Sequence, residues 1–116
     1  MGYFKNTTVN GEGVLDVSVK DVFEGRADVK LIDVRRPDEW VGELGHIEGS
    51  TLMTLETDFA QGIRGEDHEQ TIVFVCRSGA RSSRAAAFAR ALGFVDVYNM
   101  QGGMIAWNDQ RLPISK

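Results

Sequence analysis

The chain has 116 residues, of which 42% are hydrophobic and 26% are charged, and its formal net charge is −4. This length and composition predict one globular domain with a buried core. The negative charge provides no basic face for nucleic acid, and no apolar run approaches the roughly 20 residues of a membrane-spanning helix.

Cysteine and histidine are scarce in this chain. Cys76 is the only cysteine, and His46 and His68 are the only histidines. One cysteine excludes an internal disulfide, and this set of side chains does not favour a zinc site, so we expect no metal and no bound cofactor. The first residues lack the apolar segment of a secretory signal, and a lone thiol suits a reducing compartment. We therefore expect a cytoplasmic protein.

The first part of the chain predicts short strands that alternate with short helices. Residues 1–13 are polar and are expected to form a loosely held arm. A short edge strand is expected at 14–17, followed by a helix that a capping box at Ser18 opens. Residues 29–34 form a β-branched strand pattern, and Pro37 with the acids after it fits the first turn of another helix.

The later part of the chain continues this alternation. Its expected elements are two strands, 51–55 and 95–98, and two helices, 56–62 and 104–110. Gly102 and Gly103 are predicted to turn the chain into the last helix. We expect the domain to span residues 14–113 and residues 114–116 to form a tail. Such alternation predicts a parallel sheet with helices on both faces, whose ligands bind beyond the carboxyl ends of the strands.

The clearest pattern surrounds the only cysteine. Residues 71–75 form an apolar, β-branched run that is typical of a buried strand and ends at Cys76. The polar loop 76–81 leads into an Ala-rich helix, 82–92, which Gly93 ends.

This placement predicts a reactive thiol. Cys76 lies just before a helix N-terminus, where backbone N–H groups and the helix dipole stabilise an anion. Arg77 and Arg81 lie on the same loop, and their positive charges favour the thiolate over the thiol.

Four segments resemble the signatures of single-domain rhodaneses, and they occur in the same order. They are LIDVR at 31–35 with PDEW at 37–40, GHIEGS at 45–50, VCRSGARS at 75–82 and GGMIAW at 102–107. Ser50 stands where the family usually has alanine. The resemblance implies a three-layer α/β fold, with a five-stranded parallel sheet and helices on both faces. It also implies transfer of sulfane sulfur through a cysteine persulfide.

The resemblance assigns roles to the loop residues. Cys76 is the catalytic nucleophile, which carries the sulfur as a covalent persulfide. The loop after it binds the substrate and holds the negative outer sulfur with its N–H groups. Its residues are Arg77, Ser78, Gly79, Ala80, Arg81 and Ser82. Gly79 lets the backbone turn, Ser78 can donate a hydrogen bond, and Ser82 is expected to cap the helix.

The expected reaction uses thiosulfate, or a persulfide or polysulfide, as the sulfur donor, and Arg77 resembles the loops of members that use thiosulfate. An acceptor such as cyanide or a thiol then removes the sulfur, which predicts ping-pong kinetics. The partners are thus a small-molecule donor and acceptor. A protein thiol or a desulfurase is a further candidate, whereas nucleic acid and membranes are not.

Two other functions remain open. Phosphatases and arsenate reductases of similar architecture carry C-x5-R, whereas Cys76 and Arg81 form C-x4-R. Phosphate is bulkier than one sulfur atom and needs the wider ring, so the shorter loop favours sulfur transfer. A persulfide carrier that serves a partner protein without turnover would need the same residues as the enzyme.

Asp33 and Arg35 lie at a strand end and are candidates to support the active loop. The competing interpretation, which we favour, is a structural ion-pair network with Asp38 or Glu39. We interpret His46 as a histidine that holds the fold by hydrogen bonding to the backbone, rather than as a proton shuttle.

Overall fold

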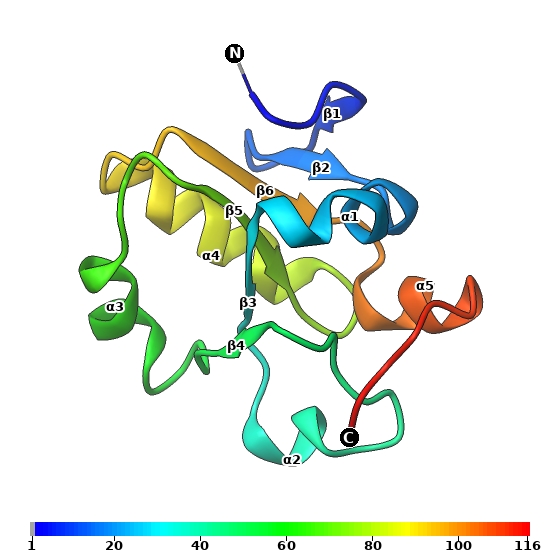
Figure 1. Ribbon diagram of the computed structural model, residues 1–116. Helices are drawn as coiled ribbons and strands as arrows, with labels where there is room; N and C mark the ends of the chain where they lie inside the picture. The colour runs from blue at the N-terminus through cyan, green and yellow to red at the C-terminus, as the bar shows by residue number, and fades with distance from the viewer. Residues whose placement is uncertain (1) are drawn as a thin grey trace.

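The computed structural model describes residues 2–116 (Figure 1). Within these residues the chain forms six strands, five α-helices and two short 3-10 helices. The strands are β1 (Thr7–Val9), β2 (Leu15–Val17), β3 (Lys30–Asp33), β4 (Thr51–Leu52), β5 (Thr71–Val75) and β6 (Asp96–Met100). The α-helices are α1 (Val19–Gly25), α2 (Pro37–Trp40), α3 (Phe59–Gly62), α4 (Ala80–Ala91) and α5 (Gly103–Asp109), and the 3-10 helices are Arg26–Asp28 and Ile63–Gly65.

The strands form one sheet in the order β1-β2-β6-β5-β3-β4. The five strands from β2 to β4 are parallel, which confirms the predicted parallel sheet. A sixth strand corrects the prediction, because β1 pairs antiparallel with β2 and makes the sheet mixed. β2 is therefore not an edge strand. β1 belongs to the expected N-terminal arm, whose first residue lies outside the described residues.

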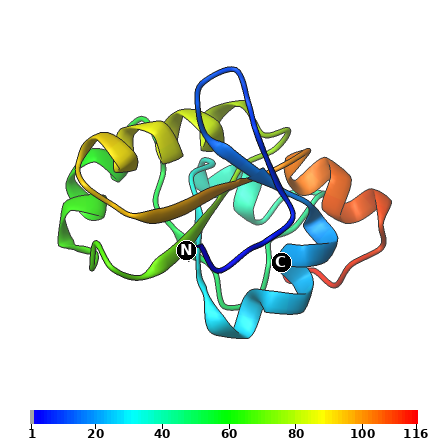
Figure 2. The ribbon, with the colours of Figure 1, turned by 90° about the horizontal axis from the view of Figure 1, so that it is seen from above.

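Helices cover both faces of the sheet, as the three-layer prediction requires. Alternate residues of a strand point to opposite faces, so Phe74 and Cys76 lie on one side and Val73 and Val75 on the other. The first face packs against α3 and α4, and the second against α1 and α5. Figure 2 shows α4 and α1 on opposite sides of the sheet. Over residues 2–116, no helix combines the length and apolar character needed to cross a membrane.

The ends of the elements shift by a few residues from their expected positions. Ser18 caps α1 as predicted, because its Oγ accepts the N–H of Asp21 at 3.2 Å. Pro37 is the first residue of α2. α4 begins at Ala80, two residues before the predicted start, and this difference changes the role of Ser82.

Candidate active site

Cys76 lies directly after β5, at the carboxyl end of the parallel sheet, and is 1% exposed. It packs in the core cluster on the α4 side of the sheet, but its sulfur has polar neighbours. The N–H of Gly79 donates to Sγ at 3.1 Å, and the Ser82 hydroxyl oxygen lies 3.2 Å from Sγ. The loop thus bends back over the sulfur and presents hydrogen-bond donors to it.

Gly79 allows this bend. Its φ of 107° lies in the left-handed region, which disfavours residues with a Cβ, and the residue immediately precedes α4. This conformation places the Gly79 N–H toward Sγ. Ser82 lies inside the first turn of α4, so the expectation that it caps the helix is wrong. Its hydroxyl contacts Cys76 and Asn99 instead.

The start of α5 holds the loop after Cys76 from the other side. The N–H of Met104 donates to the carbonyl of Cys76 at 2.9 Å, and the N–H of Ile105 donates to that of Arg77 at 3.0 Å. A Cβ on Gly103 would lie 2.4 Å from the Arg77 oxygen and 2.5 Å from the Cys76 oxygen. Gly103 therefore permits a close approach of two backbones, beyond the turn that its sequence position suggests.

Arg81 and Glu39 form an ion pair that joins α4 to α2. The two guanidinium nitrogens donate to the two carboxylate oxygens, each at 2.8 Å. These hydrogen bonds, together with the N–H of Arg36, lower the pKa of Glu39 to about 2, although burial opposes the shift. The same hydrogen bonds raise the pKa of Arg81, and the electrostatic effect of Cys76 adds to the increase. Arg81 is thus directed at Glu39.

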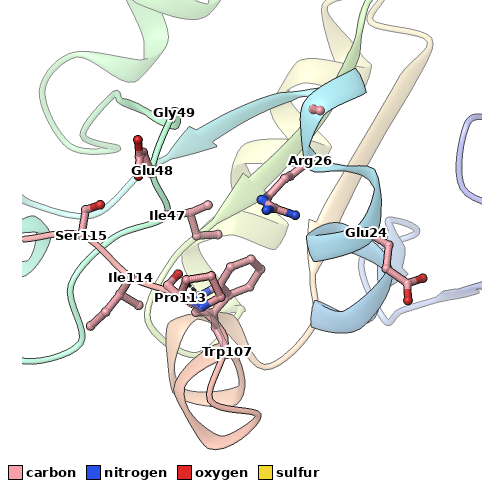
Figure 3. A pocket seen from close by; sticks show the side chains of 10 residues that line it. Glu24, Arg26, Ile47, Glu48, Gly49, Trp107, Pro113, Ile114 and Ser115 are labelled. Atoms are coloured by element: carbon pink, nitrogen blue, oxygen red, sulfur yellow. Dashed lines mark hydrogen bonds between the residues drawn. The ribbon is translucent and has the colours of Figure 1, made fainter.

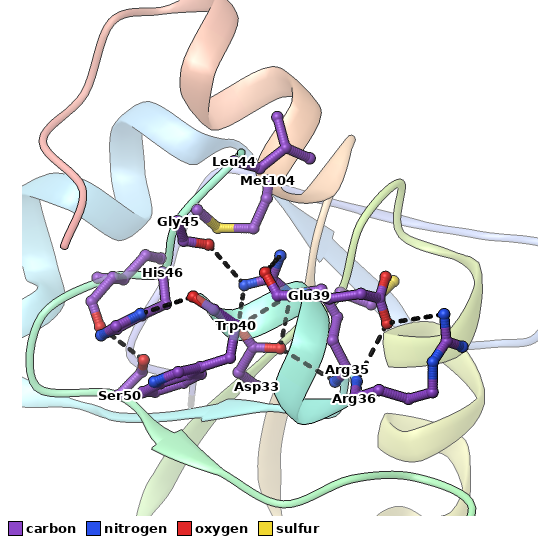
Figure 4. A network of polar contacts seen from close by, with 12 residues as sticks. Asp33, Arg35, Arg36, Glu39, Trp40, Leu44, Gly45, His46, Ser50 and Met104 are labelled. Atoms are coloured by element: carbon purple, nitrogen blue, oxygen red, sulfur yellow. Dashed lines mark hydrogen bonds and ion pairs between the residues drawn. The ribbon is translucent and has the colours of Figure 1, made fainter. Parts of the chain in front are cut away.

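Asp33 and Arg35 form a buried ion pair with each other, and each is 1% exposed (Figure 4). Arg35 Nη2 lies 2.8 Å from the Asp33 carboxylate and also donates to the carbonyl of Gly45 at 2.7 Å. Nη1 donates to the carbonyl of Glu39 at 3.3 Å. The expected network exists, but it reaches α2 through a backbone carbonyl rather than through the carboxylates of Asp38 or Glu39.

His46 packs beside this network. Its ring stacks on Trp40 with a centroid separation of 3.7 Å, and its Nδ1 lies 2.9 Å from the Trp40 carbonyl oxygen (Figure 4). His46 and Ser115 also exchange two backbone hydrogen bonds of 2.8 Å. These contacts agree with a role in holding the fold.

Two openings flank the loop after Cys76. Exposed Arg77 lines one, a cavity of about 130 Å³ with Arg35, Glu39 and Leu44 among its walls. The other, of about 290 Å³, lies beside Ser78, Gly79 and Ala80, with Asn10, Asp16 and Asn99 on its far side. The loop residues predicted to bind substrate are thus divided between the two openings, and neither Arg81 nor Ser82 lines one. Arg35 shares the first opening with Arg77, but neither it nor Asp33 makes a hydrogen bond to residues 76–82.

A further cavity of about 580 Å³ lies away from Cys76. Figure 3 shows Arg26, Ile47 and Trp107 on its walls and the C-terminal segment beside it. None of the loop residues lines it. No group of three or more His, Cys, Asp or Glu side chains suited to a metal ion occurs in residues 2–116.

Sequence reasoning missed Asp16 and Asn99 as neighbours of the site. Both are polar residues on the face of the sheet that otherwise packs apolar side chains against α4, and they are register partners in β2 and β6. Each lies two residues after a buried valine of that face, Val14 or Val97, and this spacing marks them as inward-facing. The pairing of the two strands, which brings them together, leaves no mark in the sequence.

Known proteins resemble this chain in sequence. Thiosulfate sulfurtransferase GlpE of Pseudoalteromonas translucida is 35% identical over 82 residues, which cover 71% of this chain and 75% of that protein. Some curated relatives are much longer proteins, and the chain spans 26% of their length.

Solved structures show the same fold over most of the chain. A Rhodopseudomonas palustris protein of unknown function, described as a possible tyrosine phosphatase, is 27% identical with a TM-score of 0.77, and the match covers 97% of this chain and 99% of that one. The polysulfide-sulfur transferase of Wolinella succinogenes is 32% identical with a TM-score of 0.68, covering 84% and 75%. The family model described as Rhodanese-like domain matches residues 17–110. The chain therefore belongs to the rhodanese-like domain family.

Proposed function

We propose that the protein is a sulfurtransferase that carries sulfane sulfur as a persulfide on Cys76. The observation that supports this most directly is the cup around Sγ, in which the N–H of Gly79 and the hydroxyl of Ser82 lie within 3.2 Å of the sulfur. The similarity to a thiosulfate sulfurtransferase and to a polysulfide-sulfur transferase supports the same chemistry. A reducing compartment such as the cytoplasm suits it, because the lone thiol stays reduced there.

The reaction proceeds in two displacement steps. The Cys76 thiolate attacks the outer sulfur of thiosulfate, a new S–S bond forms at Sγ, and sulfite leaves with the electron pair of the broken bond. An acceptor such as cyanide or a thiolate then attacks the outer sulfur of the persulfide and regenerates the thiolate. The loop N–H groups stabilise the negative sulfur in each state, and exposed Arg77 attracts the anionic donor.

Two features favour sulfur over phosphorus at this site. The loop closes on Cys76 itself, with the Gly79 N–H already 3.1 Å from Sγ. Arg81, which a phosphate would need as a partner, is bound to Glu39 through both of its terminal nitrogens. Because one relative is described as a possible tyrosine phosphatase, hydrolysis of p-nitrophenyl phosphate remains a necessary comparison.

Intact-mass spectrometry after incubation with thiosulfate tests the proposal. We expect the protein to gain one sulfur atom, about 32 Da, as a persulfide that cyanide removes. The Cys76→Ser variant should fold and gain nothing. Absence of the adduct on the unmodified protein, or turnover of p-nitrophenyl phosphate with none of thiosulfate, would overturn the proposal.

Steady-state kinetics with thiosulfate and cyanide separate an enzyme from a persulfide carrier. An enzyme gives parallel double-reciprocal plots, the pattern of a ping-pong reaction. A protein that forms the persulfide but does not turn over is a carrier for a partner thiol, and that result would replace the enzymatic assignment.

A further inference from the structure

A chain of polar contacts leads from Asp16 to the sulfur of Cys76. The Nδ2 of Asn99 donates to Oδ1 of Asp16 at 2.9 Å, and the Ser82 hydroxyl lies 2.5 Å from Oδ1 of Asn99. The same hydroxyl oxygen lies 3.2 Å from Cys76 Sγ. Ser82 is fully buried and Asn99 is 4% exposed, so water does not compete strongly for these contacts.

Asp16 fixes the direction of this chain. An ionised carboxylate only accepts hydrogen bonds, so the NH2 group of Asn99 must face Asp16. Asn10 adds a second donor to the same Oδ1 of Asp16, at 3.0 Å. The register of β2 and β6 places Asp16 and Asn99 opposite each other. The carbonyl oxygen of Asn99 is therefore held toward Ser82.

Ser82 then has one proton and two acceptors. Its hydroxyl can donate to Asn99 Oδ1 or to Cys76 Sγ, but not to both at once. When Cys76 is a thiol, both contacts are satisfied, because Ser82 donates to Asn99 and the S–H donates to Ser82 Oγ. When Cys76 is a thiolate, Ser82 must turn its proton to the sulfur and leave the Asn99 oxygen without that donor.

We propose that Asn99, held by Asp16, is a positioning residue that competes with Cys76 for the proton of Ser82 and so limits the thiolate fraction of the resting protein. The proposal rests on the proposed function, in which the Cys76 thiolate starts the reaction. Persulfide formation moves the negative charge from Sγ to the outer sulfur, and the Ser82 hydroxyl then turns back to donate its hydrogen bond to Asn99. The chain of contacts from Asp16 through Asn99 to Ser82, called the relay below, thus has one arrangement for the thiolate and another for the thiol and the persulfide.

No covalent bond changes within the relay. On ionisation the thiol proton goes to water or buffer, while Ser82 keeps its proton and rotates about its Cβ–Oγ bond. Other charges also act on Cys76 and are unchanged in the Asn99→Leu and Ser82→Ala variants described below. The charged groups near the site lie on every side of it. They are Arg81 with Glu39 and Glu56, exposed Arg77 with Glu43, the Asp33–Arg35 pair, and Asp16 with Glu12.

The pH dependence of iodoacetamide alkylation of Cys76 tests the relay without any sulfur donor. Asn99→Leu should move the midpoint to lower pH, because Sγ becomes the only acceptor of the Ser82 proton. Ser82→Ala should move it to higher pH, because the thiolate loses a donor. One hydrogen bond corresponds to about a threefold to tenfold change in thiolate fraction at a fixed pH below the midpoint. Ser50→Ala is the control, since the Ser50 hydroxyl donates to the carbonyl of Ile47 and not to this chain of contacts, and it should leave the midpoint unchanged.

A double variant separates the relay from a general structural effect. In the Ser82→Ala background, Asn99→Leu should leave the midpoint unchanged, because there is no proton left to compete for. An equal shift in both backgrounds, or no shift in either, would overturn the proposal. If Asn99→Leu does not fold, Asp16→Asn serves instead, and its downward shift should be larger with Ser82 present than without it. Persulfide formation is measured in a separate experiment, so the relay and the proposed sulfurtransferase function can each fail without the other.

Discussion

Glu39 and Arg81 meet through two hydrogen bonds of 2.8 Å although 42 residues separate them in the chain. Glu39 also accepts the N–H of Arg36 at 3.0 Å, which closes the first turn of α2. Arg81 lies in the first turn of α4, directly after the loop that follows Cys76. The position of the loop is therefore tied to α2, a short helix on a different part of the chain.

Loss of this ion pair should weaken both the fold and the transfer reaction. In Glu39→Gln, the neutral amide cannot replace two charge-assisted hydrogen bonds, and Arg81 is left partly buried without a counter-charge. We expect the free energy of unfolding to fall by on the order of 1–2 kcal/mol and kcat for thiosulfate to fall with it. Urea unfolding and steady-state kinetics check this, with exposed Glu48→Gln as the control. Equal behaviour of the two variants would contradict it.

The same pair predicts a specific dependence of stability on pH. The pKa of Glu39 is lowered to about 2 in the folded protein, whereas an unfolded glutamate titrates near about 4.3. The contribution of the pair is therefore complete above the unfolded value and is lost as the pH falls toward the folded value. Urea unfolding should be measured at pH values between these two limits. As the pH decreases, the free energy of unfolding should fall more steeply for the unmodified protein than for Glu39→Gln. Parallel plots of unfolding free energy against pH for the two proteins would exclude this contribution of the ion pair.

Gly103→Ala should disrupt the catalytic loop through a direct clash. The added methyl group would lie 2.5 Å or less from the carbonyl oxygens of Cys76 and Arg77, and the φ of 57° already disfavours alanine. We expect a loss of about 1–3 kcal/mol in unfolding free energy and a strong loss of persulfide formation. Gly65→Ala is the control, because a Cβ there would have no neighbour within 4 Å. A fully active Gly103→Ala variant would show that the loop tolerates movement.

Arg77→Ala should affect donor binding more than turnover. Arg77 is exposed beside Cys76 and lines the small cavity next to the loop, so its charge acts mainly on the approach of an anion. We expect KM for thiosulfate to rise while kcat changes little, and the rise should shrink at high salt. Arg64→Ala removes an exposed arginine elsewhere and should leave KM unchanged. An unaltered KM in Arg77→Ala would refute the substrate role.

Asp33→Asn should destabilise the domain far more than a surface charge change does. The substitution leaves the Arg35 guanidinium buried without its partner, for which the typical cost is about 3–5 kcal/mol. Thermal and urea unfolding measure this loss. If the pair also supports the active loop, kcat falls at temperatures where the variant is still folded, and an unchanged kcat there would limit Asp33 and Arg35 to stability.

The sequence is most informative where local chemistry and pattern agree. The β-branched run of β5, the lone Cys76 and the Ala-rich helix after it predict the central strand–loop–helix correctly, apart from the start of α4. The strand β1 was not predicted, because three residues with mostly exposed side chains carry little periodic signal. Ser82 was assigned to a cap because helix starts are among the least certain features of a sequence.

Contacts between distant segments account for the rest of the differences. Glu39 reaches Arg81, and Asp16 reaches Asn99, only after the sheet has placed α2 beside α4 and β2 beside β6. A polar residue at an inward strand position indicates that it needs a partner, but it does not identify that partner. The place of Cys76 at the end of β5, before a loop and a helix, could therefore be predicted from the sequence, whereas its polar neighbour Asn99 could not.

Asp16 and Asn99 are 83 residues apart in the chain. Closing so long a loop costs conformational entropy, so contacts of this kind form late in folding. On the ribosome, β2 emerges early and must wait until β6 has been synthesised before the two strands can pair. A nascent polypeptide that already displays Cys76 still lacks Asn99, so the sulfur gains its full set of polar neighbours only after the chain has been extended through β6.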